Sequence, residues 1–212
     1  GDNSEDEAVS DIFRLKDKGE RKLALRYEFT FQLKRLMKNK KLPYKRYQIG
    51  EVFRDEPVNS NRFRQFVQCD VDIIGTSENT AREEAEILAI VKEVLDKLGI
   101  KFVIYAGNRK LLNEILEQYN IKEKDREDVI REIDKLDKLS EKEIKDNLKK
   151  YGAEKILNVL KSKESFFKIY KEYKEIEELK KYCKYYGVDV KFLPSLARGL
   201  SYYNGNVFEI KT

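Results

Sequence analysis

Residues 44–74 read YKRYQIGEVFRDEPVNSNRFRQFVQCDVDII, and this stretch decides the fold. Two β-rich runs, residues 44–53 and 66–74, are separated by the polar segment 54–62. Aromatic and β-branched side chains favour strands, whereas a segment rich in Asp, Asn and Pro favours a loop. Two strands joined by roughly ten polar residues predict a long antiparallel hairpin.

One face of this hairpin is predicted to be polar. Gln68, Asp70 and Asp72 occur at every second position, so their side chains lie on the same side of a strand. Arg54 and Arg62 flank the loop, where guanidinium groups can make bidentate contacts with phosphate oxygens. An interpretation without a ligand stays open for each feature: the polar strand face can be a solvated sheet surface, and the loop can be a salt-bridged turn.

Periodicity predicts further elements before and after the hairpin. Residues 22–26 have the pattern of a short strand, and the apolar residues of segment 30–38 share one helical face. A helix over residues 80–98 is expected to end at Gly99, because glycine is the residue typical of a helix C-cap.

The rest of the chain changes character twice. Residues 101–105 predict a strand and residues 109–118 a helix. From 121 to 186 the sequence is rich in Lys and Glu, has Leu and Ile at helical spacing and contains no proline. This pattern predicts a small all-helical insert, after which a β-type pattern resumes at Val188.

The composition narrows the possible chemistry. The 212 residues include no histidine, which excludes nucleophiles activated by histidine and the usual zinc hydrolase sites. Cys69 and Cys183 are too few for a disulfide framework, which indicates a reducing, cytoplasmic setting, and no apolar run could cross a membrane. A net charge of +5 mildly favours a polyanionic partner such as RNA. Chemistry by arginines, carboxylates and amides remains, which suits phosphate transfer without a metal site in the protein itself.

Several segments resemble those of histidyl-tRNA synthetases. Residues 25–30 (LRYEFT), 45–54 (KRYQIGEVFR) and 63–73 (FRQFVQCDVDI) are similar to motifs of that family, the last two to its motif 2. Residues 197–209 (ARGLSYYNGNVFE) resemble the family's own signature, although Ser201 stands where the family usually has Asp. Tyr27 and the QCDVDI run resemble the archaeal and eukaryotic branch, and the similarity covers essentially the whole chain.

The resemblance implies an α+β fold, with the antiparallel sheet of class II aminoacyl-tRNA synthetases flanked by helices. Residues 1–120 and 187–212 would form a partial catalytic core, and residues 121–186 a helical insertion domain. It also implies that the sequence is a fragment, because it lacks the family's motif 1, motif 3 and anticodon-binding domain.

The resemblance further implies roles for individual residues. Arg54 and Arg198 would be catalytic, with both guanidinium groups on the α-phosphate of ATP. The set implied for histidine is Glu28, Phe29, Thr30, Arg54, Gln68, Asp72, Arg198, Tyr202 and Tyr203. The set implied for ATP is Arg54, Glu56, Arg62, Phe66 and Arg198. Asp72 and the two tyrosines would read the imidazole ring, with Asp70 as the second choice of carboxylate.

The implied activity is that of a histidine–tRNA ligase. Such an enzyme activates L-histidine with ATP and Mg²⁺ and transfers it to tRNA(His), as a cytoplasmic homodimer. Two related proteins without ligase activity remain as alternatives: the regulatory subunit of an ATP phosphoribosyltransferase and the synthetase-like module of a stress kinase. Both tend to lose parts of the ATP site, whereas this chain has Arg54, Glu56, Arg62, Gln68 and Arg198.

Overall fold

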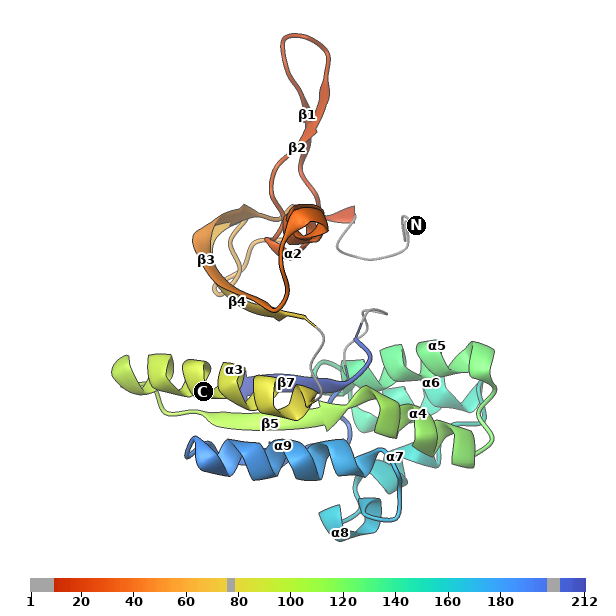
Figure 1. The fold of residues 1–212 in the computed structure, drawn as a ribbon. Coiled ribbons are helices and arrows are strands. Elements are labelled where there is room, and N and C mark those ends of the chain that lie inside the picture. Colours follow the sequence, from red (N-terminus) through yellow and green to blue (C-terminus); the bar gives the residue numbers. More distant parts are fainter. Residues whose placement is uncertain (1–9, 76–78, 198–202) are drawn as a thin grey trace. The chain divides into compact units, whose positions relative to one another are not determined.

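The computed structural model describes residues 10–75, 79–197 and 203–212. The chain divides into two compact units, Gly1–Glu78 and Asn79–Thr212 (Figure 1). Each unit has its own sheet and its own buried side chains, and each is described by itself.

The first unit is built on one long hairpin. Strands β3 (Tyr44–Phe53) and β4 (Gln65–Ile74) pair antiparallel along their whole length, from Tyr44 opposite Ile74 to Phe53 opposite Gln65. The predicted hairpin is therefore confirmed, with β4 beginning one residue earlier than expected. Helix α2 (Thr30–Leu36) continues into the 3₁₀ turn η1 (Met37–Asn39), in place of the single helix expected over residues 30–38.

A glycine brings the start of α2 against the hairpin. A Cβ atom on Gly50 of β3 would lie 3.3 Å from Cζ of Phe29, the residue that precedes α2. Phe29 is fully buried and Leu33, one turn into the helix, is 2% exposed. The missing side chain at residue 50 thus leaves room for the phenyl ring, and α2 is anchored on one face of the strand pair.

A second, shorter hairpin of this unit was not predicted. Strand β1 (Arg14–Lys16) pairs antiparallel with β2 (Lys22–Ala24), the latter lying within the predicted strand 22–26. Asp17 stabilises the turn, because its Oδ1 accepts from the backbone N–H groups of Gly19 and Arg21 at 2.9 and 3.0 Å. Around β1, Phe13 and Leu15 alternate with Arg14 and Lys16, but a run of four residues is too short to identify a strand with any certainty from periodicity.

The second unit contains a three-stranded sheet with β5 (Val103–Asn108) in the centre. Strand β6 (Val190–Phe192) pairs parallel with β5 on one edge. Strand β7 (Asn206–Lys211) pairs antiparallel with β5 on the other edge (Figure 1). The sheet thus adds one parallel pair to the antiparallel pairing that the family resemblance implies. This parallel pair follows a long connection through helices, as parallel strands require.

Helices surround this sheet. Helix α3 (Thr80–Lys97) matches the predicted helix, begins at an Asn79 cap and is followed by Gly99 with a φ of +68°, as expected for a C-cap. The other helices of the unit are α4 (Arg109–Gln118), α5 (Glu123–Asp134), the 3₁₀ turn η2 (Lys135–Asp137), α6 (Glu141–Lys149), α7 (Ile156–Leu160), α8 (Glu164–Phe167) and α9 (Tyr173–Tyr185).

The helical segment shares a core with the rest of the unit. Helix α9 packs against α3, and the hydroxyl of Tyr182 on α9 accepts a 2.8 Å hydrogen bond from Asn79. Buried apolar side chains from Ala81 to Ala197 form one continuous hydrophobic cluster that includes α5 to α9. Residues 121–186 are therefore helical as predicted, while their status as an insertion domain stays a prediction.

A polar network around the buried Asn108, at the end of β5, ties this unit together. Asn108 is 3% exposed, and its Nδ2 donates to Glu175 on α9 at 2.7 Å and to Asn206 on β7 at 2.8 Å. Its Oδ1 accepts from the backbone N–H of Leu111, which caps α4. Asn206 in turn donates to Glu84 on α3 at 2.6 Å. One buried amide, with its hydrogen-bonding groups satisfied, thus links four elements.

Glu84 makes the stability of this network depend on pH. The pKa of Glu84 is raised from its usual 4.5 to about 6: burial is the largest cause and the Glu175 carboxylate adds to it, while the hydrogen bond from Asn206 and the charge of Lys110 oppose it. An acid with a raised pKa in the folded state binds more protons there than in the unfolded chain. The free energy of unfolding therefore falls as pH rises through the interval from 4.5 to about 6.

We predict that Glu84→Gln stabilises the protein at neutral pH. The glutamine keeps an oxygen that accepts from Asn206 but carries no charge, so the free energy of unfolding should rise by about 1–2 kcal/mol at pH 7.5. The gain should disappear at pH 4, where the wild-type carboxyl is protonated. Urea unfolding at both pH values measures this, with Glu93→Gln, an exposed carboxyl on the same helix, as control. An equal gain at both pH values would contradict the prediction.

Candidate functional site

Three of the predicted site residues of the first unit, Phe66, Gln68 and Asp72, lie on one face of the β3–β4 hairpin. This face, which holds Gln68, Asp70 and Asp72, is partly buried, while the opposite face leaves Tyr47 and Ile49 75% and 62% exposed. The polar face of this hairpin is therefore less exposed to solvent than the apolar face. The predicted polar floor is therefore real, and it is not a fully solvated surface.

Arg54 is held rigidly just after β3. Its guanidinium carbon lies 4.6 Å from the ring centre of Tyr27 and 5.1 Å from that of Phe66, so the group is placed between two aromatic rings. Its Nη2 donates to Oε1 of Gln68 at 3.0 Å, and its Nε to the carbonyl oxygen of Tyr27 at 3.4 Å. Stacking and hydrogen bonds together fix the plane of this guanidinium.

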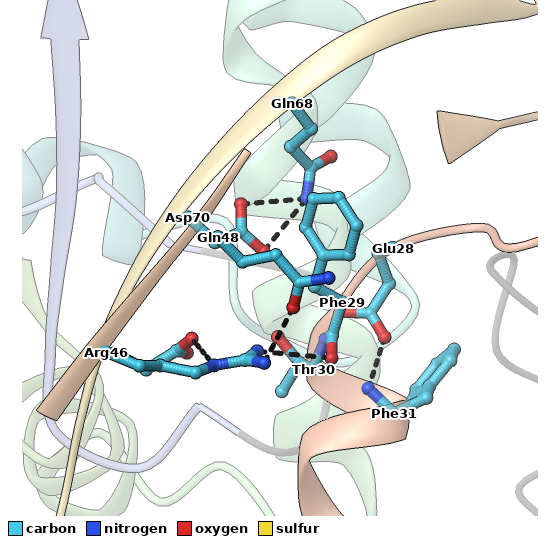
Figure 2. Close-up of polar contacts among 9 residues, drawn as sticks. Glu28, Phe29, Thr30, Phe31, Arg46, Gln48, Gln68 and Asp70 are labelled. Atoms are coloured by element: carbon cyan, nitrogen blue, oxygen red, sulfur yellow. Dashed lines mark hydrogen bonds and ion pairs between the residues drawn. The ribbon is translucent and has the colours of Figure 1, made fainter. Parts of the chain in front are cut away.

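Gln68 connects Arg54 to a carboxylate. Its Nε2 donates to both oxygens of Asp70, at 2.9 and 3.0 Å (Figure 2). Burial raises the pKa of Asp70, and the Asp72 and Glu28 carboxylates add to this, while the bond from Gln68 and the charge of Arg46 oppose it. The face therefore concentrates negative charge that a cationic ligand would relieve.

Arg46 and Gln48 belong to this face, although the sequence analysis assigned them no role. Arg46 Nε donates to Oδ2 of Asp72 at 2.8 Å, and its Nη1 donates to Oε1 of Gln48 at 2.7 Å. Its Nη2 reaches the carbonyl oxygen of Phe29 at 3.3 Å (Figure 2). The strand register places Arg46 directly opposite Asp72. The sequence alone does not predict this register, because an irregular loop between two strands does not fix which residues face each other.

Glu28 caps helix α2. Its Oε2 accepts from the backbone N–H of Thr30 at 2.6 Å, and its other oxygen accepts from that of Phe31 (Figure 2). A carboxylate at a helix N-terminus is stabilised by the free N–H groups and the helix dipole. This contact fixes the carboxylate beside the polar face of the hairpin.

The loop between β3 and β4 contains salt bridges, which agrees with the interpretation of this segment as a salt-bridged turn. Arg62 lies 3.4 Å from Glu56 and Arg64 lies 3.7 Å from Asp55, and the two arginine side chains remain 59% and 57% exposed. Surface pairs of this kind contribute little to stability, about 0–1 kcal/mol. The guanidinium groups can therefore exchange these partners for phosphate oxygens at small cost, and the contact of Arg62 with ATP stays a prediction.

The remaining predicted residues cannot be placed in this face. Arg198, Ser201 and Tyr202 lie outside the described residues. Tyr203 is described in the second unit, where it is partly buried. The segment before them packs closely on β5, because a Cβ atom on Gly107 would lie 2.3 Å from the carbonyl oxygen of Leu196.

Two features that other functions require are not found within residues 10–75, 79–197 and 203–212. No group of three or more Cys, Asp or Glu side chains there is arranged to hold a metal ion. None of the helices described is long and apolar enough to cross a bilayer.

Sequence comparison finds bacterial relatives. The family model described as Histidyl-tRNA synthetase matches residues 2–211. Histidine–tRNA ligase 1 of Bacillus cereus is 38% identical over 226 residues, which cover 97% of this chain and 53% of that protein. The histidine–tRNA ligase of Helicobacter hepaticus is 42% identical over 151 residues, 68% of this chain and 34% of that protein. The chain spans about half the length of the Bacillus relative. These relatives do not support the predicted archaeal or eukaryotic branch.

Solved structures share the fold. Histidyl-tRNA synthetase from Nostoc sp. PCC 7120 has a TM-score of 0.76 at 28% identity, over 94% of this chain and 52% of that chain. A Bacillus halodurans protein described as an ATP phosphoribosyltransferase regulatory subunit/histidyl-tRNA synthetase has a TM-score of 0.78 at 22% identity, over 95% and 57%. The second likeness shows the fold alone. Together they confirm the predicted α+β class II fold.

Proposed function

The chain belongs to the histidyl-tRNA synthetase family, and on that premise we propose that it carries part of the catalytic core of a histidine–tRNA ligase. The observation that carries the proposal is the arrangement of Arg54. Its guanidinium is fixed between Tyr27 and Phe66 and bonded to Gln68, on the face that also holds Asp72. A fixed cation beside carboxylates suits a ligand that has both negative and positive groups, as an amino acid does.

The proposed reaction is the activation of L-histidine. A carboxylate oxygen of histidine attacks the α-phosphorus of ATP. A bond forms between this oxygen and the phosphorus, and the bond between the phosphorus and the pyrophosphate leaving group breaks. Negative charge grows on the phosphate oxygens during this displacement, where fixed guanidinium groups stabilise it. Arg54 and Arg198 are the proposed donors. Mg²⁺ accompanies ATP and neutralises phosphate charge, while Glu56, Arg62 and Phe66 are proposed to bind the nucleotide.

The proposed histidine site uses the polar face of the hairpin. Glu28, Thr30 and Gln68 are proposed to hold the α-amino end, and Asp72 the imidazole ring. The geometry supports this division, because Glu28 sits at the start of α2 and Asp72 on β4. Phe29, Tyr202 and Tyr203 complete the proposed set: Phe29 is fully buried beneath Gly50 and contributes its backbone and packing.

The later steps are proposed from the family alone. Transfer of histidine to tRNA(His), a cytoplasmic location and a homodimeric full-length protein belong to this part of the proposal. The relatives support the substrate of this proposal, since those proteins are histidine–tRNA ligases.

ATP–pyrophosphate exchange with each of the common amino acids tests the proposal. Exchange that depends on histidine alone supports it. A protein that binds histidine in calorimetric titration but supports no exchange, even after addition of any segments missing from this sequence, would instead fit the regulatory-subunit alternative. Absence of histidine binding would contradict both.

Asp72→Asn tests which carboxylate reads the ring. An aspartate that accepts from a ring N–H forms a charge-assisted bond, and a ligand without that donor leaves the carboxylate unpaired. We expect Asp72→Asn to raise the KM for histidine by at least about tenfold, with the KM for ATP nearly unchanged. Asp70→Asn is the matched comparison. If Asp70→Asn impairs histidine binding and Asp72→Asn does not, the second choice of carboxylate is correct.

Arg54→Lys tests the catalytic arginine without removing its charge. A lysine cannot stack as a plane between Tyr27 and Phe66 and at the same time donate to Gln68 and phosphate. We expect the exchange rate to fall by about 10²–10³, the effect of removing one transition-state donor, with the thermal unfolding midpoint little changed. Arg35→Lys, an exposed position on α2, is the control. An exchange rate within about threefold of wild type would contradict the assigned role.

A further inference from the structure

We propose that Arg46 is a positioning residue that sets the distance between the two ends of the histidine site, acting through Asp72. This inference rests on the proposed function, because it concerns the same face of the β3–β4 hairpin. It adds a residue to which neither the sequence motifs nor the family resemblance gave a role.

Arg46 spans the site from the ring end to the amino end. At one end its Nε bonds Oδ2 of Asp72 at 2.8 Å. At the other end its Nη2 bonds the carbonyl oxygen of Phe29, the residue between Glu28 and Thr30. A single planar side chain thus connects the carboxylate proposed for the imidazole to the backbone that carries the groups proposed for the α-amino end.

The third contact of Arg46 makes this connection rigid. Nη1 donates to Oε1 of Gln48 at 2.7 Å, so strand β3 also holds the guanidinium (Figure 2). The side chains of Arg46 and Asp72 are only 11% and 18% exposed. A planar fork with three partners on separate elements has little rotational freedom, and its geometry is passed on to the carboxylate it binds.

The charges on this face explain why Asp72 needs such a partner. Asp70 lies two residues away on the same side of β4, and its pKa is raised mainly by burial, with the Asp72 and Glu28 carboxylates adding to the rise. Without Arg46, Asp72 would face this repulsion partly buried and unpaired, and its side chain would turn away from the face. With Arg46 bound to Oδ2, the carboxylate keeps one orientation and its other oxygen serves a ring N–H.

Calorimetric titration of L-histidine and of ATP into the whole chain tests this inference. Arg46→Leu removes all three bonds, and Lys45→Leu, on the opposite face of the same strand, is the matched control. We expect Arg46→Leu to raise the Kd for histidine at least about tenfold and to leave the Kd for ATP within about twofold. Lys45→Leu should change neither value. A merely structural role would weaken both ligands together.

The double variant Arg46→Leu/Asp72→Asn shows whether Arg46 acts through Asp72. If it does, the double variant binds histidine no more than about threefold more weakly than Asp72→Asn alone. If the Kd for histidine in the double variant instead rises by the product of the two single increases, the inference is overturned. A wild-type Kd for histidine in Arg46→Leu would also overturn it. If Arg46→Leu does not fold, Arg46→Lys takes its place: its single ammonium cannot reach three partners, so a raised Kd for histidine alone supports the inference and wild-type affinity overturns it.

The same experiment separates this inference from the proposed function. If the unaltered chain binds no histidine, the proposed function fails and this inference fails with it. If the unaltered chain binds histidine and Arg46→Leu binds it equally well, the inference alone is overturned.

Discussion

The register of β3 against β4 is the constraint on which the candidate site depends. It sets Arg46 opposite Asp72 and Gly50 opposite Gln68. Side chains alternate between the two faces of a strand, so a shift of one residue would move every polar group to the other face. Gly50 makes the register productive, since its missing side chain admits the ring of Phe29 and brings helix α2 over the polar face.

The hairpin reverses the usual distribution of polar and apolar side chains. Its polar face is partly covered, and partly buried polar groups are costly unless they are hydrogen-bonded. Here they bond one another: Arg54 binds Gln68, Gln68 binds Asp70, and Arg46 binds Asp72. These groups are thereby fixed before a ligand binds, so little conformational entropy is lost in ordering them on binding.

The second unit uses a buried amide for a comparable purpose. Asn108 satisfies partners on α9, α4 and β7, and it ends the strand against which the Leu193–Ala197 segment lies. Leu193 donates to the carbonyl oxygen of Ala106 at 2.9 Å, and Gly107 allows the close approach that follows. Asn108 thus holds Asn206 on β7, and the β5 backbone holds Leu193 separately.

Local pattern was enough to determine many elements of this protein. The period of 2 gave the β3–β4 hairpin, the period of 3.6 gave α4 at its observed bounds, and Gly99 gave the end of α3, because these signals lie within a few residues of one another. The sequence motifs identified the family correctly. They did not identify the branch, because the bacterial relatives do not support the predicted archaeal or eukaryotic one. They also nominated Arg54, Gln68 and Asp72 as site residues, whose roles stay predictions.

Only the tertiary structure decided which residues meet. Arg46 stands 26 residues before Asp72, and the parallel pairing of β5 with β6 joins strands separated by six helices, so neither contact has a local signature. The cover over the polar face likewise depends on Phe29 reaching Gly50 from another element. Local periodicity records which side of an element is apolar, whereas register and partner are chosen by the packing of the whole unit.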